Sequence, residues 1–342
     1  MTRRIKALLV LVCILALTAG SVPAQDERVP GQGFIKAHSS IIPAPGKHRG
    51  TPGSHPAYTP ALSPGMSPLR QPAPRATVGA SPVIGLLGYH ASLQQSGLYS
   101  PCGIGVSYRG DRIYITQSDD CDVELLYNKE YKTYVHLGWD PGPIRNRGNL
   151  YCTVTDNGYS DIYRVGPGGY DEWIGWAYDG CDYDYISAID VDRATGDVYF
   201  MVNCDYWEWT ALYVLPAKDF GGEAYIVDSW YDDPCWGLAV KGNKIYSTSY
   251  YDGSVWVCDK SGDNWEEIIF GFEGPCDLGF DKLGNLFVAE WDGGSVARVR
   301  AGSTNVARLA VGLDSPYYLE LDGQGRVFVS DMHAGNIWMF WK

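Results

Sequence analysis

The chain has 342 residues, of which 45% are hydrophobic and 20% charged, with 27 Lys and Arg against 40 Asp and Glu. The hydrophobic share excludes a disordered protein as a whole, and the acidic balance argues against a nucleic-acid binder. Its 41 Gly, 25 Tyr and 12 Trp favour short strands and turns over helices. The length suits one large domain or two small ones.

The N-terminus predicts an export signal over residues 1–24. Three basic residues within the first six positions precede an apolar run from Ala7 to Ala19, and Val22-Pro23-Ala24 offers small residues for cleavage. The run is short for a spanning helix, which needs about 20 residues, although a retained membrane anchor is the alternative. We therefore expect a secreted or periplasmic protein whose mature chain does not insert into a membrane.

Residues 25–82 have the composition of a disordered spacer, because 11 of the 20 Pro lie here among Ser, Thr, Gly and Ala. The remainder of the chain is strongly acidic. Residues 81–342 hold 18 Lys and Arg against 38 Asp and Glu, a net charge of −20. This charge repels nucleic acid and anionic lipid and favours cationic, basic or neutral ligands. The alternative is that it only keeps an exported protein soluble.

A repeated phrase predicts the fold of residues 83–342. A Gly, followed by one or two polar residues in most copies, precedes an apolar and aromatic strand. Six copies occur, and their glycines are separated by 38, 48, 46, 42 and 41 residues. This period is typical of propeller blades, each a small antiparallel sheet. The glycines of the six copies are Gly110, Gly148, Gly196, Gly242, Gly284 and Gly325.

The repeats are therefore expected to form an all-β, six-bladed β-propeller. The sixth copy lacks a fourth strand because the chain ends, and Val83–Tyr89 stands before the first copy as an unassigned strand. We expect this N-terminal strand to complete the last blade, so that no strand edge stays open between the first and last blades. The second copy departs from the pattern, because two prolines and two arginines lie between Trp139 and Gly148. An irregular blade is expected there.

The sequences Gly284-Asn-Leu-Phe-Val-Ala-Glu-Trp-Asp-Gly-Gly and Gly325-Arg-Val-Phe-Val-Ser-Asp-Met-His-Ala-Gly-Asn resemble repeats of TolB-like propellers, especially the NHL type. The sequence Ile189-Asp-Val-Asp-Arg-Ala-Thr-Gly-Asp-Val-Tyr is similar to the YWTD variant of this architecture. The resemblance covers about residues 83–342. It implies the fold rather than the function, because these propellers include binding modules, receptors, lactonases and lyases.

We expect the ligand site at the end of the central channel where the chain enters each innermost strand and leaves each second strand. We name this end the loop face. Aromatic and acidic residues suited to sugar stacking or cation capture are concentrated there in the sequence. Trp207, Trp209 and Trp230 are expected in loops, whereas aromatic residues within strands alternatively fill the space between blades. The candidate ligand-binding residues are Asp156, Asp184, Asn203, Trp207, Trp236, Tyr251, Asp277, Glu290, Asp331 and His333.

The resemblance extends to the SMP-30/gluconolactonase branch, which implies a metal held by Glu, Asn and Asp and used to polarise a lactone carbonyl. The matching positions at the starts of innermost strands are Gly103, Trp236, Asp277 and Tyr317, so Asp277 is the one candidate ligand for Ca²⁺. Glu290 and Asp331 follow second strands, where NHL-type repeats carry an acid that caps the next turn. No nucleophilic Ser can be paired with a base.

Eight cysteines remain after the signal, an even number that favours disulfides in an exported protein. Cys102 with Cys121, and Cys181 with Cys204, fit the start of a first strand beside the end of a second. Cys235 with Cys276 is a weaker pairing, and Cys152 and Cys258 are expected as buried thiols.

We favour a monomeric, non-enzymatic binding propeller with an aromatic and acidic face for a carbohydrate, peptide or cationic ligand. No cofactor is required by this interpretation. The alternative is a Ca²⁺-dependent lactonase or other hydrolase of the SMP-30/gluconolactonase type.

Overall fold

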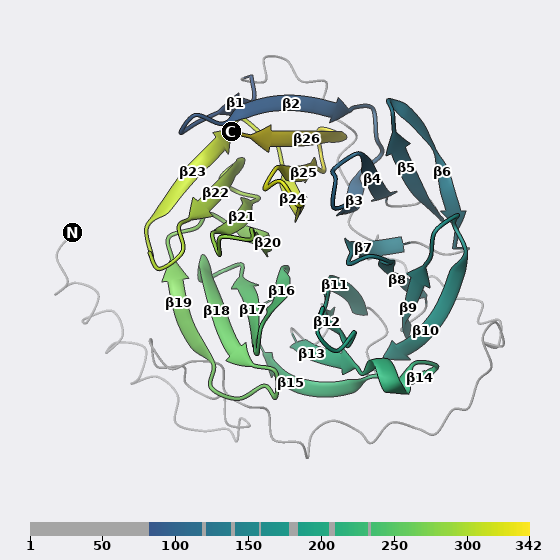
Figure 1. Ribbon diagram of the computed structural model, residues 1–342. Helices are drawn as coiled ribbons and strands as arrows, with labels where there is room; N and C mark the ends of the chain where they lie inside the picture. Colours follow the sequence, from purple (N-terminus) through teal and green to yellow (C-terminus); the bar gives the residue numbers. More distant parts are fainter. Residues whose placement is uncertain are drawn as a thin grey trace, which may run out of the picture. The chain divides into compact units, whose positions relative to one another are not determined.

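The computed structural model describes residues 82–117, 121–137, 141–156, 159–177, 184–204, 209–231 and 234–342. The signal peptide and nearly all of the spacer lie outside these ranges. Within them the chain is built from strands, with a single 3-10 turn, η1 (Ala217–Asp219). The strands form six sheets arranged around a central axis (Figure 1), and their pairing is antiparallel except for the short pair of β10 with β14. The predicted six-bladed β-propeller is therefore confirmed.

The first three blades follow each other along the chain, each beginning with its innermost strand. Blade 1 contains β3 (Pro101–Val106), β4 (Arg112–Gln117), β5 (Asp122–Tyr127) and β6 (Glu130–His136). Blade 2 contains β7 (Pro141–Asn146), β8 (Leu150–Asp156), β9 (Tyr159–Val165), β10 (Asp171–Ala177) and the short β14 (Gly222–Glu223). Blade 3 contains β11 (Asp184–Val191), β12 (Val198–Cys204), β13 (Trp209–Leu215) and β15 (Tyr225–Tyr231).

The last three blades complete the ring. Blade 4 contains β16 (Leu238–Lys241), β17 (Lys244–Ser249), β18 (Ser254–Asp259) and β19 (Glu266–Phe270). Blade 5 contains β20 (Pro275–Phe280), β21 (Leu286–Glu290), β22 (Ser295–Val299), β23 (Val306–Val311) and β1 (Ile84–Gly85). Blade 6 contains β24 (Pro316–Leu321), β25 (Val327–Asp331), β26 (Asn336–Trp341) and β2 (His90–Gln95). The innermost strands β24 and β3 are neighbours, which closes the circle.

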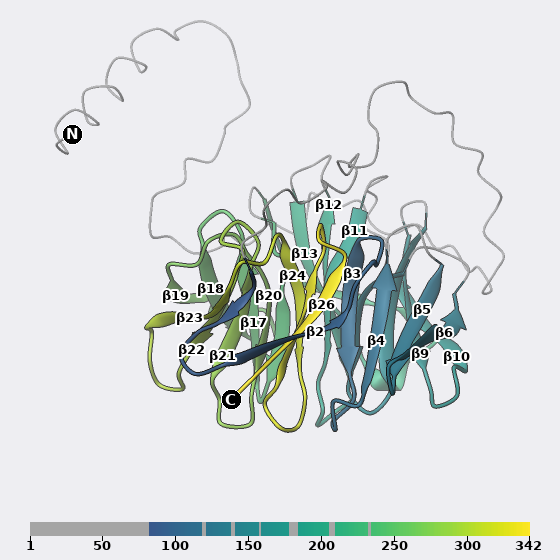
Figure 2. The same cartoon turned by 90° about the horizontal axis from the view of Figure 1, so that it is seen from above.

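The repeated Gly of the sequence pattern forms the turn between the first and second strands of every blade. All six of these glycines have a positive φ, between 61° and 100°. A residue with a Cβ atom adopts this conformation only under strain, so the turn requires Gly. Figure 2 shows the hairpin ends of the blades on one side of the ring. We name this side, opposite the loop face, the turn face.

The hydrophobic core is divided among the spaces between blades. The described residues form six buried apolar clusters, and each joins one blade to the next. Phe340 of blade 6 and Phe287 of blade 5, for example, share one cluster. Fully burying a side chain of this size contributes about 1.5–3 kcal/mol. The ring is thus held together by side chains that alternate across each sheet rather than by one central core.

The ring closes through a different segment from the one expected. Within Val83–Tyr89, Ile84 and Gly85 pair with Val311 and Ala310, so they extend blade 5. The strand that completes blade 6 is β2, which runs antiparallel to β26 from His90 to Gln95. The prediction of an N-terminal closing strand was correct in kind and wrong in its residues. An outermost strand is half exposed, so β2 has a mixed sequence, whereas the sequence search favoured an apolar run.

Two further expectations have different outcomes. Blade 2 is irregular at its innermost strand as expected, because the pairing of β7 with β8 shifts register between Pro141 and Ile144. The innermost strands of blades 1, 5 and 6 carry a similar shift, so this irregularity is not peculiar to blade 2. The prolines are compatible with a strand because the inner edge of β7 has no neighbouring strand in its sheet and needs no N–H donors there. Trp209 and Trp230 do not lie in loops. They belong to β13 and β15, are buried, and pack in the clusters between blades.

Candidate functional site

Six rings form a continuous aromatic arc on the loop face. Neighbouring ring centroids lie between 4.9 and 6.3 Å apart, and the rings meet edge to face or at a steep tilt. Such contacts each contribute about 0.5–1.5 kcal/mol beyond burial, so the rings support one another. In order along the arc, the residues are Tyr251, Tyr250, Trp236, Tyr317, Trp291 and His333.

The positions of these rings follow from the propeller repeat. Trp236 directly precedes the short strand β16, and Tyr317 is the second residue of β24, so both stand where an innermost strand begins. The other four rings follow the ends of the second strands β17, β21 and β25. The arc therefore spans blades 4, 5 and 6. The predicted candidates Trp236, Tyr251 and His333 are brought together as expected.

The arc combines exposed rings with anchored ones. Tyr251 is 73% exposed and His333 is also exposed, whereas Trp236, Trp291 and Tyr317 are half-buried. His333 is held by a hydrogen bond between its Nδ1 and Ser315 Oγ at 2.7 Å, which leaves Nε2 at the outer side of the ring. A ligand that lies on this face would meet flat apolar surfaces with a polar group at one end.

A carboxylate stands beside the second ring of the arc, Tyr250. The hydroxyl of Tyr250 donates to Asp292 Oδ2 at 3.0 Å. Burial and this acceptor raise the pKa of Tyr250, so its phenol stays protonated at neutral pH. Asp292 itself is exposed. Rings beside a carboxylate suit a sugar, whose hydroxyls donate, or a cation.

Glu290 and Asp331 do not point to a ligand. Glu290 is buried and accepts from the N–H of Glu273 and from Arg308. Asp331 is buried and accepts from the N–H groups of Asp314 and Ser315. Both acids therefore cap the loop that enters the innermost strand of their own blade. The repeat resemblance implied a structural role for them, but at the turn that follows them in the sequence, so the role is as implied and the capped loop is not.

Asp277 forms a buried ion pair with Arg145 of β7. Its Oδ1 accepts from the Arg145 guanidinium at 2.5 Å and from the N–H of Leu278, and its Oδ2 accepts from the N–H of Leu319. The side chain of Asp277 has no exposed surface, and that of Arg145 is 3% exposed. Burial raises the pKa of Asp277, whereas Arg145 and the two N–H groups favour its ionised form.

This geometry does not fit the expected calcium ligand. Both oxygens of Asp277 are already engaged, and Ca²⁺ needs six to eight oxygen ligands. In the described part of the chain, no group of three or more His, Cys, Asp or Glu residues is placed to hold a metal ion. We therefore derive no chemistry through a metal at this position.

The remaining candidates have mixed outcomes. Asn203 is buried, donates to the carbonyl oxygen of Cys235 at 3.1 Å, and accepts from Thr210 Oγ1, so it joins blades 3 and 4. Asp156 ends β8 and Asp184 begins β11, in agreement with their expected positions, but their side chains are not described. Trp207 lies outside the described residues.

The cysteines only partly follow the expected pairings. Over the described ranges no disulfide joins Cys102 to Cys121; Cys102 lies in a bulge of β3 and its thiol donates to the carbonyl oxygen of Pro141 at 3.2 Å. The thiol of Cys102 thus lies between Pro141 of blade 2 and Thr116 of β4, whose Oγ1 is 3.6 Å from it. Cys204 is disulfide-bonded, but its expected partner Cys181 lies outside the described residues. Cys152 and Cys258 are buried thiols as expected, and burial raises the pKa of Cys258 to about 12.

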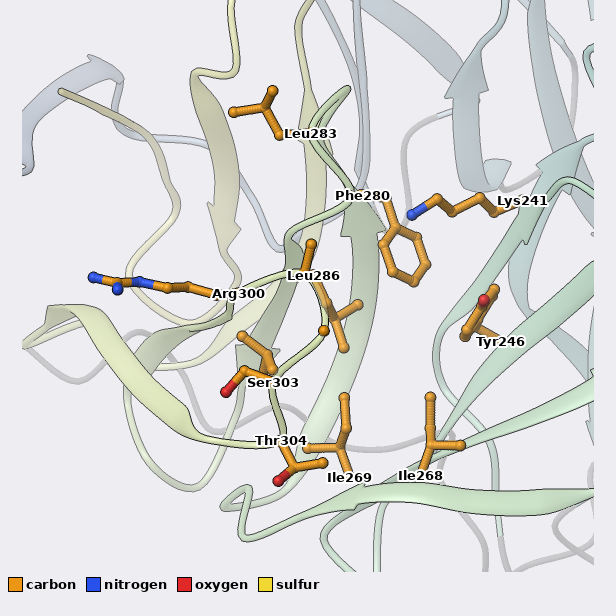
Figure 3. A pocket seen from close by; sticks show the side chains of 14 residues that line it. Lys241, Tyr246, Ile268, Ile269, Phe280, Leu283, Leu286, Arg300, Ser303 and Thr304 are labelled. Atoms are coloured by element: carbon orange, nitrogen blue, oxygen red, sulfur yellow. The ribbon is translucent and has the colours of Figure 1, made fainter.

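The channel also opens at the turn face, where sequence reasoning placed no site. A cavity of about 1040 Å³ is lined there by the turns of all six blades. Deep within it, Arg147 lies 2.7 Å from Asp190 and 2.9 Å from Glu320. A separate groove of about 510 Å³ lies between blades 4 and 5, with Ile268, Ile269, Phe280 and Leu286 among its lining residues (Figure 3).

Four residues of these sites were missed. Trp291 carried no signal beyond being the residue after a second strand, and Tyr317 was noted only as a position without an acid. Arg145 and Arg147 lie in the proline-containing segment that suggested an irregular strand. Arg145 lies in β7 and Arg147 in the turn that follows it, and both line the turn-face cavity.

Comparison with solved structures supports the fold. A gluconolactonase from Xanthomonas campestris superposes with a TM-score of 0.62 at 11% identity, over 77% of this chain and 98% of that one. The calcium-binding protein regucalcin from Agrobacterium tumefaciens gives 0.59 at 10% identity, over 73% and 93%. Virginiamycin B lyase from Staphylococcus aureus gives 0.53 at 14% identity, over 74% and 99%. At these identities the likeness concerns the propeller architecture.

No protein-family model matches the sequence, and no curated protein matches it. The class that the structure defines is thus a six-bladed β-propeller. Among the residues that the structure describes, a helix with the length and apolar character needed to cross a membrane is not found.

Proposed function

We propose that the protein is an exported, non-enzymatic binding propeller that holds a carbohydrate on the aromatic arc of its loop face. The observation that carries the proposal is that the arc is continuous. Six rings from three blades lie in a row, and the centroids of neighbouring rings are no more than 6.3 Å apart. Export is supported by the signal-like sequence of residues 1–24.

A carbohydrate fits these groups better than a peptide or a cation. Sugar rings have apolar faces that stack on aromatic side chains and hydroxyl groups at their edges. Asp292, which accepts from Tyr250, and His333, the last ring of the arc, supply an acceptor and a second polar group for those hydroxyls. The net charge of −20 for residues 81–342 does not oppose a neutral ligand.

The test begins with a calorimetric screen of soluble oligosaccharides. The affinity of variants of the protein is then measured for the oligosaccharide that binds most tightly. Tyr251→Ala should weaken binding by at least about fivefold, since loss of one ring contact costs about 1 kcal/mol. Tyr170→Ala is the matched control, because Tyr170 is 74% exposed and lies between β9 and β10, away from the arc. Equal affinities of the two variants, or no binding by any sugar, would contradict the proposal.

A lactonase is the second candidate, and the structural similarity to gluconolactonases favours it. Turnover of an aldonolactone that stops on chelation and returns with Ca²⁺ would support this function. The engagement of Asp277 with Arg145 argues against the expected ligand, so such activity would require other residues. Sugar binding without turnover of lactones would favour the binding propeller.

A further inference from the structure

The turn-face cavity has features of a second binding site, unrelated to the aromatic arc. Its volume of about 1040 Å³ lies at the upper end of the usual range for small-molecule pockets, about 300–1,000 Å³. It lies around the propeller axis, and each blade contributes its first turn to the wall. The ion pairs of Arg145 and Arg147 lie at its inner end.

The acids that line this cavity are already matched by donors. Asp190 and Glu320 pair with Arg147, Asp192 with Lys260, and Asp322 with Arg326. Asp281 accepts from the N–H groups of Leu283 and Asn285. Asp111 accepts from the hydroxyl of Ser107, which lowers its pKa. Four of the six acids that line the cavity are therefore in ion pairs, whereas Asp111 and Asp281 accept from neutral groups and keep their charge.

Cations at the rim are left without such partners. In the described ranges, Arg109, Arg193 and Lys282 form no ion pair within 4 Å, and all three are exposed. Lys241 lies beside them with its ammonium 4.1 Å from the centre of the Phe280 ring (Figure 3). These four residues come from the first turns of blades 1, 3, 5 and 4, so they stand around the opening rather than on one side of it.

We propose that this cavity binds a small organic polyanion, a molecule with two or more carboxylate or phosphate groups. A net charge of −20 for residues 81–342 would by itself repel such a ligand. Exposed cations around one cavity, with most of its acids in ion pairs, create the opposite local field. Charge-assisted hydrogen bonds from Arg and Lys to anionic oxygens are the strong ones in proteins, and Arg binds them in pairs.

The experiment titrates the full chain by calorimetry at low ionic strength with citrate and, separately, with inorganic pyrophosphate. The double variant Arg193→Gln/Lys282→Gln removes two rim charges at exposed positions. Lys132→Gln/Lys218→Gln is the control, because it removes the same charge from exposed residues that do not line the cavity. Thermal unfolding of each variant establishes that it is folded.

The proposal expects one binding site for at least one probe, weakened by about tenfold or more in the rim variant and by less than about twofold in the control. Preference for citrate or for pyrophosphate distinguishes a carboxylate from a phosphate ligand, and either supports the site. The site is ruled out if neither probe binds at millimolar concentration, or if the two variants lose affinity equally. Tyr251→Ala should leave these titrations unchanged, so this result is separate from that of the sugar screen.

Discussion

At the scale of single residues, the blades are joined around the channel by charged side chains that are almost completely buried, above all Arg145 and Asp277. Arg145 donates to the carbonyl oxygens of Ile189 and Leu319 as well as to Asp277. One side chain thus connects blades 2, 3, 5 and 6. Desolvation opposes the charge of Arg145, but Asp277 and other nearby acids outweigh it and raise its pKa. The pair is costly to separate, since either partner alone would be a buried, uncompensated charge.

Asp277→Ala should destabilise the protein by about 3–5 kcal/mol, because it leaves the Arg145 guanidinium buried without its counterion. Urea unfolding followed by circular dichroism measures this loss. The double variant Arg145→Met/Asp277→Leu should lose less than the single variant, since it removes both charges. A single variant with the wild-type midpoint would show that the pair does not hold the blades together.

Asp331 should make stability depend on pH. Burial raises its pKa above the usual 3.8, although the N–H groups of Ser315 and Asp314 and the nearby His333 favour the charged form. The folded protein keeps this proton at pH values where the unfolded chain has lost it. The resulting stabilisation is present below about pH 4 and is lost as the pH rises through the folded-state pKa.

The free energy of unfolding of the wild type, minus that of Asp331→Asn, should therefore be greater at pH 4 than at pH 7. Urea titrations at the two values measure both differences. A difference that is the same at both pH values would mean that the Asp331 carboxyl titrates alike in the folded and unfolded chain.

At the scale of elements, the strength of each sequence signal follows the burial of its strand. The second strands β21 and β25 are buried along their whole length, and their apolar repeats predicted both position and turn. The closing strand β2 is exposed or half-buried throughout, so its sequence His-Ala-Ser-Leu-Gln-Gln carries little periodicity. Blade 2 shows the same limit. Prolines that disfavour a central strand are compatible with β7, because that strand has a neighbour on one side only.

Shortening the N-terminus should separate the roles of β1 and β2. A chain that begins at Gly97 lacks β2 and buried Tyr89, so its melting temperature should fall by about 10 °C or more, as a loss of several kcal/mol implies. A chain that begins at Tyr89 lacks β1, half-buried Val83 and the hydrogen bond of Leu86 to Leu309 but keeps β2, and we expect a fall of about 2–4 °C at most. Differential scanning calorimetry measures both.

Equal melting temperatures for the two shortened chains would mean that β2 contributes nothing to closure of the ring. A large loss on removal of β1 alone would instead restore the first expectation, in which the segment before Tyr89 fastens the circle.

At the scale of the whole molecule, the period of the repeat was enough to predict six blades and a channel with two ends. The period could not predict at which end of the channel a cavity opens, because the cavity is shaped by side chains from six separate turns. The loop face carries the aromatic arc over blades 4–6, and the turn face carries the charged cavity. Three of the predicted site residues meet in the arc, while Asn203, Asp277, Glu290 and Asp331 serve the fold. A buried acid and a binding acid look alike in sequence.

The central claim is that the aromatic arc is the ligand site. A crystal structure of the protein with the oligosaccharide that binds it most tightly tests this claim directly. We expect a sugar ring stacked on Tyr251 or Trp236, with hydroxyls toward Asp292 or His333. Density for the sugar in the turn-face cavity, or away from all six rings of the arc, would contradict the account.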